Sequence, residues 1–145
     1  MAIKFTNRTV ELGIVQYKIL DAHDEEIGSI EGGVTNGSFV CNINIDTQFH
    51  KKGFGYEAFE MIYNEMNLRD PIEIINGSWH KSPLFDHLNN GMSTNLLIYL
   101  QSKVSQNQID SAFSTPTGRW AKKLGFTKCK IITDVEDHVE VRFTR

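Results

Sequence analysis

The spacing of the apolar residues changes abruptly near residue 50, and this change constrains the fold more than any other feature. Over residues 38–46 apolar and polar residues alternate, as is typical of a strand buried on one face. From Gly53 to Met66 the apolar residues instead recur at helical intervals. The sequence therefore predicts a one-sided strand, a short loop and an amphipathic helix in direct succession.

The rest of the chain predicts a mixed α+β protein. A helix is expected at 95–105, and a second begins after Thr115, a candidate N-cap followed by Pro116 at the first helical position. The order of these elements is typical of a mixed α+β sheet. Further strands are expected at 2–7, 16–22, 26–33, 72–76, 128–133 and 138–143.

Length and composition limit the classes of protein that this chain can represent. Its 145 residues suit one domain over residues 1–145, with a long insert at about 78–113. The net charge of -3 argues against general nucleic-acid binding, which needs a basic surface. No apolar run approaches the roughly 18 residues of a membrane span, and the first ten residues lack a signal peptide's apolar segment. We therefore expect a cytoplasmic protein without a membrane partner.

The two cysteines and the histidines are interpreted conservatively. Cys41 and Cys129 lie in apolar stretches, where reduced core thiols are expected rather than a disulfide or a nucleophile. His80 and His87 are spaced unlike a compact zinc site. The sequence therefore predicts no bound metal.

The loop between the predicted strand and helix has the composition of an anion site. It contains Lys51, Lys52, Gly53 and Gly55. A helix start presents free backbone N–H groups and the positive end of the helix dipole, which favours phosphate. The alternative is an ordinary strand-to-helix turn with solvated lysines, because two glycines alone are a weak signal.

Two motifs resemble those of the GNAT superfamily, the acyl-CoA-dependent N-acyltransferases. Residues 50–55, His-Lys-Lys-Gly-Phe-Gly, are similar to its Q/R-x-x-G-x-G/A signature, with His50 where Gln or Arg is usual. Residues 114–126 resemble the late helix of the family, which ends in x-K-L-G-F. The resemblance implies a mostly antiparallel sheet with helices on both faces. It also implies a V-shaped splay between the strands at 38–46 and 72–76.

The resemblance further implies acetyl-CoA as co-substrate. The pantetheine arm would pair with the backbone of Ile43 and Ile45, and Ser114 would stand where an Asn commonly touches the cofactor. The pyrophosphate would lie on the loop residues His50, Lys51, Lys52, Gly53, Phe54 and Gly55.

The catalytic groups are less well indicated. An amide near Ile45 could polarise the thioester carbonyl. The family's usual tyrosine acid falls at Ala121, and Tyr56 or Tyr99 could supply a phenol from elsewhere. Glu73, expected on the strand beside the splay, is the leading candidate for the general base; the alternative is a solvent-facing strand glutamate. Asp46 is the second candidate.

Two hypotheses for the function follow. The first is an N-acetyltransferase that moves an acetyl group to a primary amine of a small molecule or peptide by direct attack. The second is a CoA-binding, catalytically silent module that acts through protein contacts. Residues 9–15 are too few for the two helices that usually cover the acceptor site, so the insert at 78–113 is expected to build that pocket or to be a packed ornament. Exposed strands at the chain ends would allow a homodimer.

Overall fold

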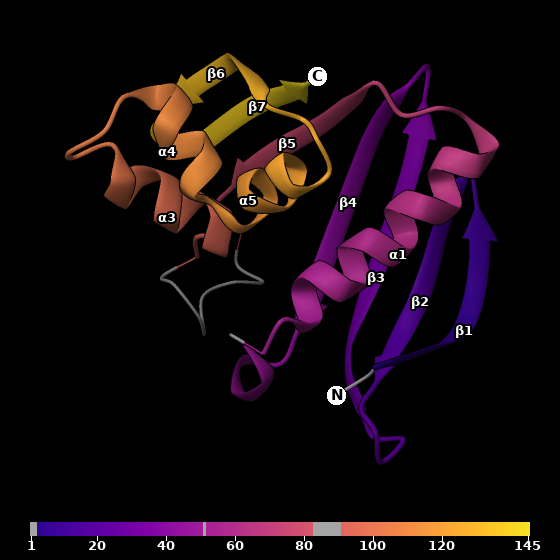
Figure 1. Cartoon of the computed structure of the whole chain (residues 1–145). Coiled ribbons are helices and arrows are strands. Elements are labelled where there is room, and N and C mark those ends of the chain that lie inside the picture. Colours follow the sequence, from indigo (N-terminus) through magenta and orange to yellow (C-terminus); the bar gives the residue numbers. More distant parts are fainter. Residues whose placement is uncertain (1–2, 51, 83–90) are drawn as a thin grey trace. The chain divides into compact units, whose positions relative to one another are not determined.

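A computed structural model describes residues 3–50, 52–82 and 91–145 (Figure 1). The chain divides into two compact units, Met1–Ile72 and Glu73–Arg145. Lys51 and His87 lie outside the described residues. The prediction of one domain over residues 1–145 remains a prediction.

The first unit is an antiparallel four-stranded sheet with one helix on it. Its strands run in the order of the chain: β1 (Lys4–Glu11), β2 (Ile14–Leu20), β3 (Glu26–Thr35) and β4 (Ser38–Ile45). A 3-10 turn, η1 (Thr47–Phe49), and helix α1 (Phe54–Arg69) follow. β1 and β2 are joined directly by a tight turn, so the predicted absence of helices between them is confirmed.

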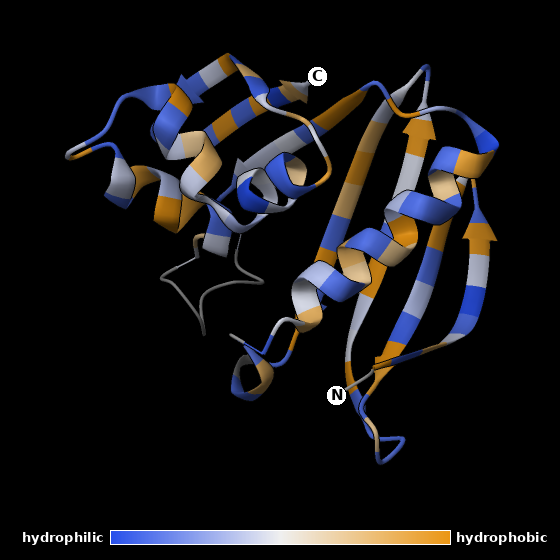
Figure 2. Ribbon diagram, viewed as in Figure 1, coloured by the Kyte–Doolittle hydropathy of each residue, from blue (hydrophilic) through white to orange (hydrophobic). Residues whose placement is uncertain are grey.

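Helix α1 lies on one face of this sheet because both surfaces are apolar there. Figure 2 shows hydrophobic residues along much of β4, with hydrophilic residues between some of them. Phe39 of β4 meets the rings of Phe59 and Tyr63 edge-on, at centroid distances of 5.6 and 5.8 Å. Gly32 of β3 lies against Ile62 of the same helix. The predicted one-sided strand and amphipathic helix are therefore confirmed.

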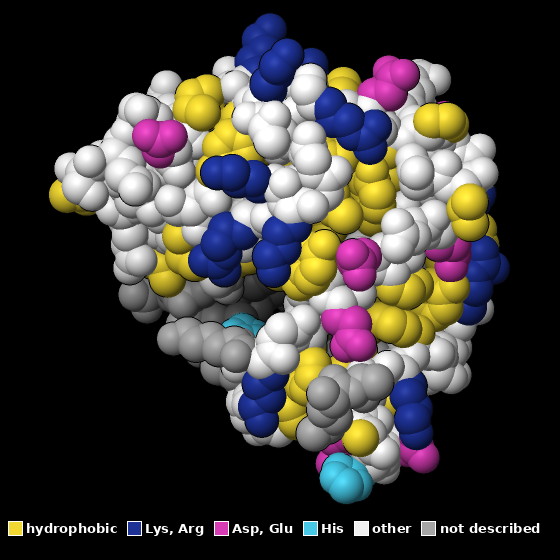
Figure 3. All heavy atoms as spheres, in the orientation of Figure 1, with side chains coloured by type: hydrophobic (Ala, Val, Ile, Leu, Met, Phe, Trp, Pro, Cys, Tyr) yellow, Lys and Arg dark blue, Asp and Glu magenta, His cyan; other side chains and the backbone are white. Residues whose placement is uncertain are grey.

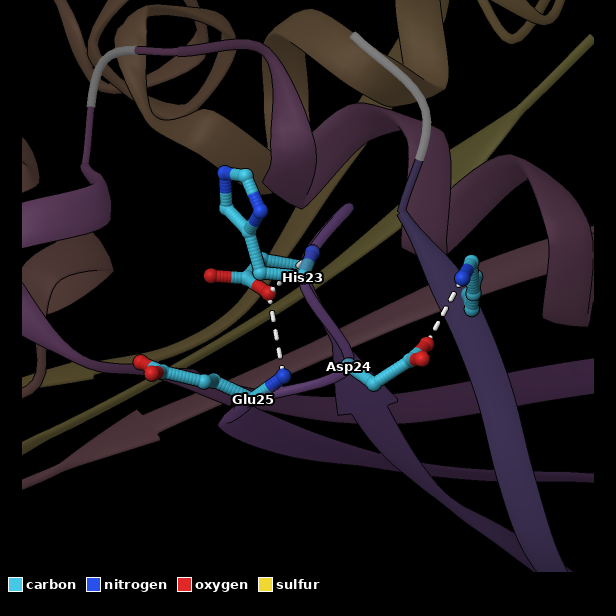
Figure 4. Close-up of polar contacts among 5 residues, drawn as sticks. His23, Asp24 and Glu25 are labelled. Carbon is cyan, nitrogen blue, oxygen red and sulfur yellow. Dashed lines mark hydrogen bonds and ion pairs between the residues drawn. The ribbon is translucent and has the colours of Figure 1, made fainter.

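The turn between β2 and β3 is held by a nearly buried carboxylate. Asp21 is 8% exposed and accepts hydrogen bonds from the amides of His23 and Glu25 at 2.8 and 3.0 Å. Figure 4 shows His23, Asp24 and Glu25 of this turn; Asp24 forms an ion pair with Lys4 at 2.6 Å. The hydrogen bond from the Glu25 amide is the main reason that the pKa of Asp21 is lowered. These contacts give the carboxylates of Asp21 and Asp24 a structural role.

The second unit is a three-stranded antiparallel sheet with helices on one face. The strands β5 (Ile74–His80), β6 (Lys128–Val135) and β7 (His138–Thr144) lie in the order β5-β7-β6. Trp79 of β5 packs on Tyr99, and Phe113 packs on Phe143 of β7, with ring centroids 5.9 and 5.2 Å apart. Tyr99 belongs to α3 (Thr94–Ser102) and Phe113 to α4 (Gln108–Ser114); α5 (Pro116–Lys123) follows in the chain.

Side-chain caps define where these helices begin. The Ser93 hydroxyl accepts from the Leu96 amide at 3.2 Å, and the Thr115 hydroxyl accepts from the Gly118 amide at 3.0 Å. Pro116 occupies the first turn of α5, as predicted. Gly125 follows α5 with a φ of 93°, the left-handed conformation expected of a glycine after a helix.

Several elements differ from the sequence prediction. The first two strands were expected at 2–7 and 16–22 but span Lys4–Glu11 and Ile14–Leu20. Strand β5 begins at Ile74 and extends to His80, whereas residues 72–76 were expected. Helix α3 ends at Ser102 rather than at residue 105. Helix α4 was not predicted at all, because its seven residues show no apolar periodicity; Asn107 caps it by accepting from the Asp110 amide at 2.8 Å.

Both cysteines are free thiols, as predicted. Burial raises the pKa of the Cys129 thiol to about 11, so it is protonated at neutral pH. Among the described helices, none is both long enough and apolar enough to cross a membrane. On the face of the molecule in Figure 3, the Lys and Arg side chains of the described residues lie in separate groups, with Asp and Glu side chains elsewhere on the same face.

The contact between α4 and α5 generates a stability prediction. An alanine methyl at position 118 would lie 2.0 Å from the Ala112 carbonyl oxygen and 2.7 Å from the Phe113 Cα. We expect Gly118→Ala to lower the free energy of unfolding by about 3 kcal/mol in urea denaturation, because backbone atoms cannot give way cheaply.

Gly125→Ala is the matched control. No atom lies within 4 Å of its added methyl group, so only the left-handed backbone is penalised, by about 1 kcal/mol. Equal losses in the two variants would show that α4 and α5 do not approach this closely.

Candidate functional site

The candidate site in the first unit is the junction between β4 and α1. β4 ends at Ile45, η1 follows, and α1 begins at Phe54. Gly53 occupies the N-cap position with a φ of 79°, and a Cβ added there would meet no atom within 4 Å. The glycine is therefore required by the left-handed backbone of the turn and not by lack of space.

The backbone of Ile43 and Ile45 points away from β3. The Asp46 amide donates to the Ile27 carbonyl at 2.8 Å, and Ile45 lies opposite Gly28 in the β3–β4 ladder. Ladder bonds alternate along an antiparallel strand. Since Asp46 bonds to β3, the N–H and C=O groups of Ile45, and of Ile43 two residues before it, are directed to the other side of β4.

The side chain of His50 contacts the strand that precedes the loop. Its Nε2 atom lies 2.7 Å from the carbonyl oxygen of Ile45. This contact ties the end of the loop to the end of the strand and occupies the Ile45 carbonyl. The Ile45 N–H remains the polar backbone group of this residue that could face a ligand.

The first turn of α1 has no side-chain cap from its N-cap residue, which is Gly53. The Glu57 amide donates to the Gly53 carbonyl at 3.2 Å. Among the described residues no acceptor is found for the amides of Phe54 and Gly55. These two N–H groups and the helix dipole therefore present positive charge at one spot.

The charged side chains around this turn have different environments. Lys52 is exposed, and its ammonium lies 5.8 Å above the ring of Phe49. The carboxylate of Glu57 accepts from the amide of Ile3 at 3.4 Å. Lys51, the other predicted lysine, lies outside the described residues. The described part of the loop can therefore supply two amides and one exposed cation to an anion.

The residues expected to act as acid or base are dispersed. Glu73 is exposed and precedes β5, so it does not lie on the strand as expected. Ala121 is completely buried. The Tyr56 hydroxyl donates to the Glu60 carboxylate at 3.0 Å, and burial is the main reason that its pKa is raised.

Tyr99 belongs to a structural cluster in the second unit. It is completely buried, and its hydroxyl donates to Asp134 Oδ2 at 2.7 Å. Lys103 Nζ and Gln108 Nε2 each reach the same oxygen at 2.8 Å. Burial, followed by the hydrogen bond to Asp134, raises the pKa of Tyr99. A buried phenol with a raised pKa is poorly suited to protonate a leaving thiolate.

Asp134 therefore joins three elements: α3, the start of α4, and β6. Burial alone would raise the pKa of Asp134, but the hydrogen bonds from Lys103, Tyr99 and Gln108 outweigh it and lower the pKa below its ordinary value. Sequence reasoning missed this cluster because its members lie 26 to 35 residues from Asp134.

Ser114 and the histidines of the second unit also have partners. The Ser114 hydroxyl lies 2.9 Å from the Asp110 carbonyl oxygen and 3.1 Å from Gln106 Oε1. His138 Nε2 lies 3.1 Å from the Ser78 hydroxyl on the neighbouring strand. Within the described residues, no group of three or more His, Cys, Asp or Glu side chains could hold a metal ion.

The predicted insert at 78–113 is partly core. It contains the end of β5, α3 and most of α4, and Leu96 and Tyr99 of α3 are completely buried. This part of the insert therefore packs on the sheet of the second unit. Its expected role in forming an acceptor pocket remains a prediction.

Comparisons with known proteins agree with this architecture. No protein-family model and no curated sequence matches the chain. Among solved structures, a spermidine N-acetyltransferase from Vibrio cholerae matches with a TM-score of 0.52 and 11% identity, covering 92% of this chain and 64% of that one. A ribosomal-protein-S5-alanine acetyltransferase from Vibrio fischeri matches with a TM-score of 0.50 and 12% identity, covering 91% and 62%.

A third match names the family directly. A protein assigned to the GNAT family of acetyltransferases, from Desulfovibrio desulfuricans, has a TM-score of 0.51 and 11% identity, with 90% of this chain and 68% of that chain covered. This chain thus spans about two thirds of the length of the three proteins. It has the GNAT fold, an α+β fold with a mostly antiparallel sheet, as the two motifs implied.

The Asp134 cluster generates a pH prediction. Because its folded pKa lies below the unfolded value of 3.8, the carboxylate stabilises the fold fully above that value and less as the pH falls through the folded pKa. We expect Asp134→Asn to lower the free energy of unfolding by about 1–2 kcal/mol at pH 7. The loss should shrink steadily below pH 3.8 in urea denaturation.

Asp137→Asn is the control, because its ion pair with Lys81 at 3.1 Å is exposed and contributes at most a few tenths of a kcal/mol. A loss for Asp134→Asn that is the same at pH 7 and at pH 3 would contradict a stabilising charge.

Proposed function

We propose that the protein is an acyl-CoA-dependent N-acyltransferase that moves an acetyl group from acetyl-CoA to a primary amine. The observation that carries this proposal is the uncapped start of α1, with Gly53 in a left-handed turn and the amides of Phe54 and Gly55 without a described acceptor. It occurs in a chain with the GNAT fold. Acetyl-CoA is the ligand that accounts for both the uncapped start of α1 and the fold.

The junction accounts for cofactor binding as follows. The diphosphate would accept hydrogen bonds from the Phe54 and Gly55 amides, aided by the dipole of α1 and the charges of Lys51 and Lys52. The pantetheine arm would bond to the backbone of Ile43 and Ile45 in the splay expected beside β4. His50 would hold the loop closed through the Ile45 carbonyl, and Ser114 would contact the cofactor only after exchanging its own partners.

The reaction needs few protein groups. The neutral amine attacks the thioester carbonyl, the N–C bond forms, the C–S bond breaks, and CoA leaves as a thiolate that takes up a proton. The Ile45 N–H would stabilise the oxyanion, and positioning of the two reactants would supply much of the acceleration. Glu73 would accept the amine proton directly or through water.

A second function is favoured by one observation. The tyrosine position of the family is the buried Ala121, and the phenol of Tyr99 is committed to Asp134. A CoA-binding module without turnover would need neither group. The release of CoA thiol from acetyl-CoA, measured over a panel of small amines and peptides, separates the two functions. Release on at least one acceptor supports the transferase, whereas binding without release on any acceptor supports the silent module.

The anion site is tested by Gly53→Glu. A carboxylate at the start of α1 would repel the diphosphate, and we expect the affinity for CoA to fall at least about tenfold in calorimetry. Gly53→Ala is the control: its methyl group meets no atom within 4 Å, so it adds backbone strain without charge. Equal affinities of the glutamate and alanine variants would contradict the anion site.

The base is tested by Glu73→Gln. If Glu73 accepts the amine proton, kcat/KM should fall by about 100-fold in the variant. The decrease in rate that protonation of Glu73 causes at acidic pH should also disappear. Asp70→Asn, at the C-cap of α1, removes a nearby negative charge and serves as the control. An unchanged pH–rate profile in Glu73→Gln would exclude Glu73 as the base and leave Asp46, the second candidate, or water in that role.

A further inference from the structure

Strand β1 is the outer strand of the sheet in the first unit. It pairs only with β2 among the described strands, and most of its residues are exposed. An open strand edge can accept another strand, so proteins commonly protect such edges with bulges or charges. β1 carries both a bulge and charged residues, and these are arranged symmetrically along the strand.

A bulge divides β1 into two arms. Its register with β2 shifts between Thr6 and Thr9, so Asn7 and Arg8 together lie opposite Tyr17. The arms are residues 4–6 and 9–11. A regular foreign strand could not stay in register across the bulge, but a second β1 with the same bulge could.

The two arms are complementary when one is reversed against the other. In an antiparallel pair with bulge facing bulge, Lys4 lies opposite Glu11, Phe5 opposite Val10, and Thr6 opposite Thr9. The pairs therefore join opposite charges, two apolar residues and two identical residues.

The two faces of the sheet agree with this pairing. Phe5 and Val10 lie opposite Ile19 and Val15, which are completely buried, so both are on the face that carries α1. Lys4 and Glu11, in the alternate positions, are on the other face. Cross-strand neighbours on the same face interact directly.

The backbone also has the right groups at the edge. The ladder alternates from the Asp46–Ile27 bond through β3 and β2 to β1, which directs the N–H and C=O of Phe5 and Val10 outward. Two-fold symmetry would form the Phe5–Val10 pair twice, because Phe5 of each copy lies opposite Val10 of the other. Each pair would make both of its backbone hydrogen bonds.

Apolar surface at the end of this edge is otherwise unexplained. Val10 is 51% exposed, and Leu12, at the hairpin tip with a φ of 52°, is 98% exposed. A branched side chain in that backbone conformation is unfavourable and calls for a compensating contact.

We propose that β1 is a self-association surface, where a second copy of this chain adds its own β1 antiparallel, bulge to bulge. The occupant is a second copy because its β1 matches the charges, the apolar pair and the bulge at once. Eight residues from each copy make a small interface, so a concentration-dependent monomer–dimer equilibrium is expected.

The test reverses one charge and then restores the pair. All variants carry Asp24→Asn, because Asp24 pairs with Lys4 and would repel a glutamate there. In analytical ultracentrifugation, Glu11→Lys should raise the dimer dissociation constant about tenfold, since both symmetric pairs become repulsive. Adding Lys4→Glu to Glu11→Lys should restore the dimer.

Glu136→Lys, in the exposed β6–β7 turn, makes the same change of charge away from β1 and should leave the dimer intact. Circular dichroism establishes that each variant is folded. A monomer at every concentration up to about 0.3 mM would overturn the proposal. A dimer dissociation constant that Glu11→Lys leaves unchanged would also overturn it. So would a folded variant with both Glu11→Lys and Lys4→Glu that does not form the dimer.

Discussion

The backbone N–H groups in the first turn of a helix cannot be bonded by the helix itself, and the account of this protein depends on that constraint at α1. A serine or aspartate at the N-cap would have bonded those groups internally. Gly53 has no side chain with which to do so, and its left-handed backbone lets the chain enter the helix from the loop. The amides of Phe54 and Gly55 are thereby left available to the anion that we propose.

The strand before the loop matters as much as the helix after it. His50 contacts the carbonyl of Ile45 and so ties the loop to the end of β4. The N–H and C=O groups of Ile45 are directed away from β3. The end of β4 and the start of α1 form the two parts of the proposed cofactor site. One short loop within a single unit joins them and fixes their positions. Lys52 is exposed and adds charge without fixing the geometry.

The chemistry proposed for the site relies on position more than on titrating groups. The phenol of Tyr99 serves the packing of the second unit through Asp134, and the residue in the family's tyrosine position is Ala121. Burial of a phenol beside a carboxylate raises its pKa and favours its neutral form, which suits a structural clamp better than an acid. We therefore expect the departing CoA thiolate to receive its proton from water.

The sequence predicted the parts of the fold that rest on local patterns. Alternation revealed β4, helical spacing revealed α1, and Thr115 with Pro116 marked the start of α5. The helix α4 was missed because capping and tertiary contacts, rather than apolar periodicity, define its seven residues.

Other features depend on distant partners and could not be predicted. The cluster at Asp134 is of this kind, since its side chains meet only through tertiary contacts. So is the bulge at Asn7 and Arg8, which is defined by its register against β2. The glycine loop was predicted from its motif, whereas the contact of His50 with Ile45 required the folded chain.

The most direct measurement of the central claim is an amide NMR titration of the ¹⁵N-labelled protein with CoA and, separately, with pantetheine, which lacks the diphosphate. The account predicts large shifts of the Phe54 and Gly55 amide resonances with CoA and little change of either with pantetheine. Saturating CoA that leaves both resonances in place would contradict it.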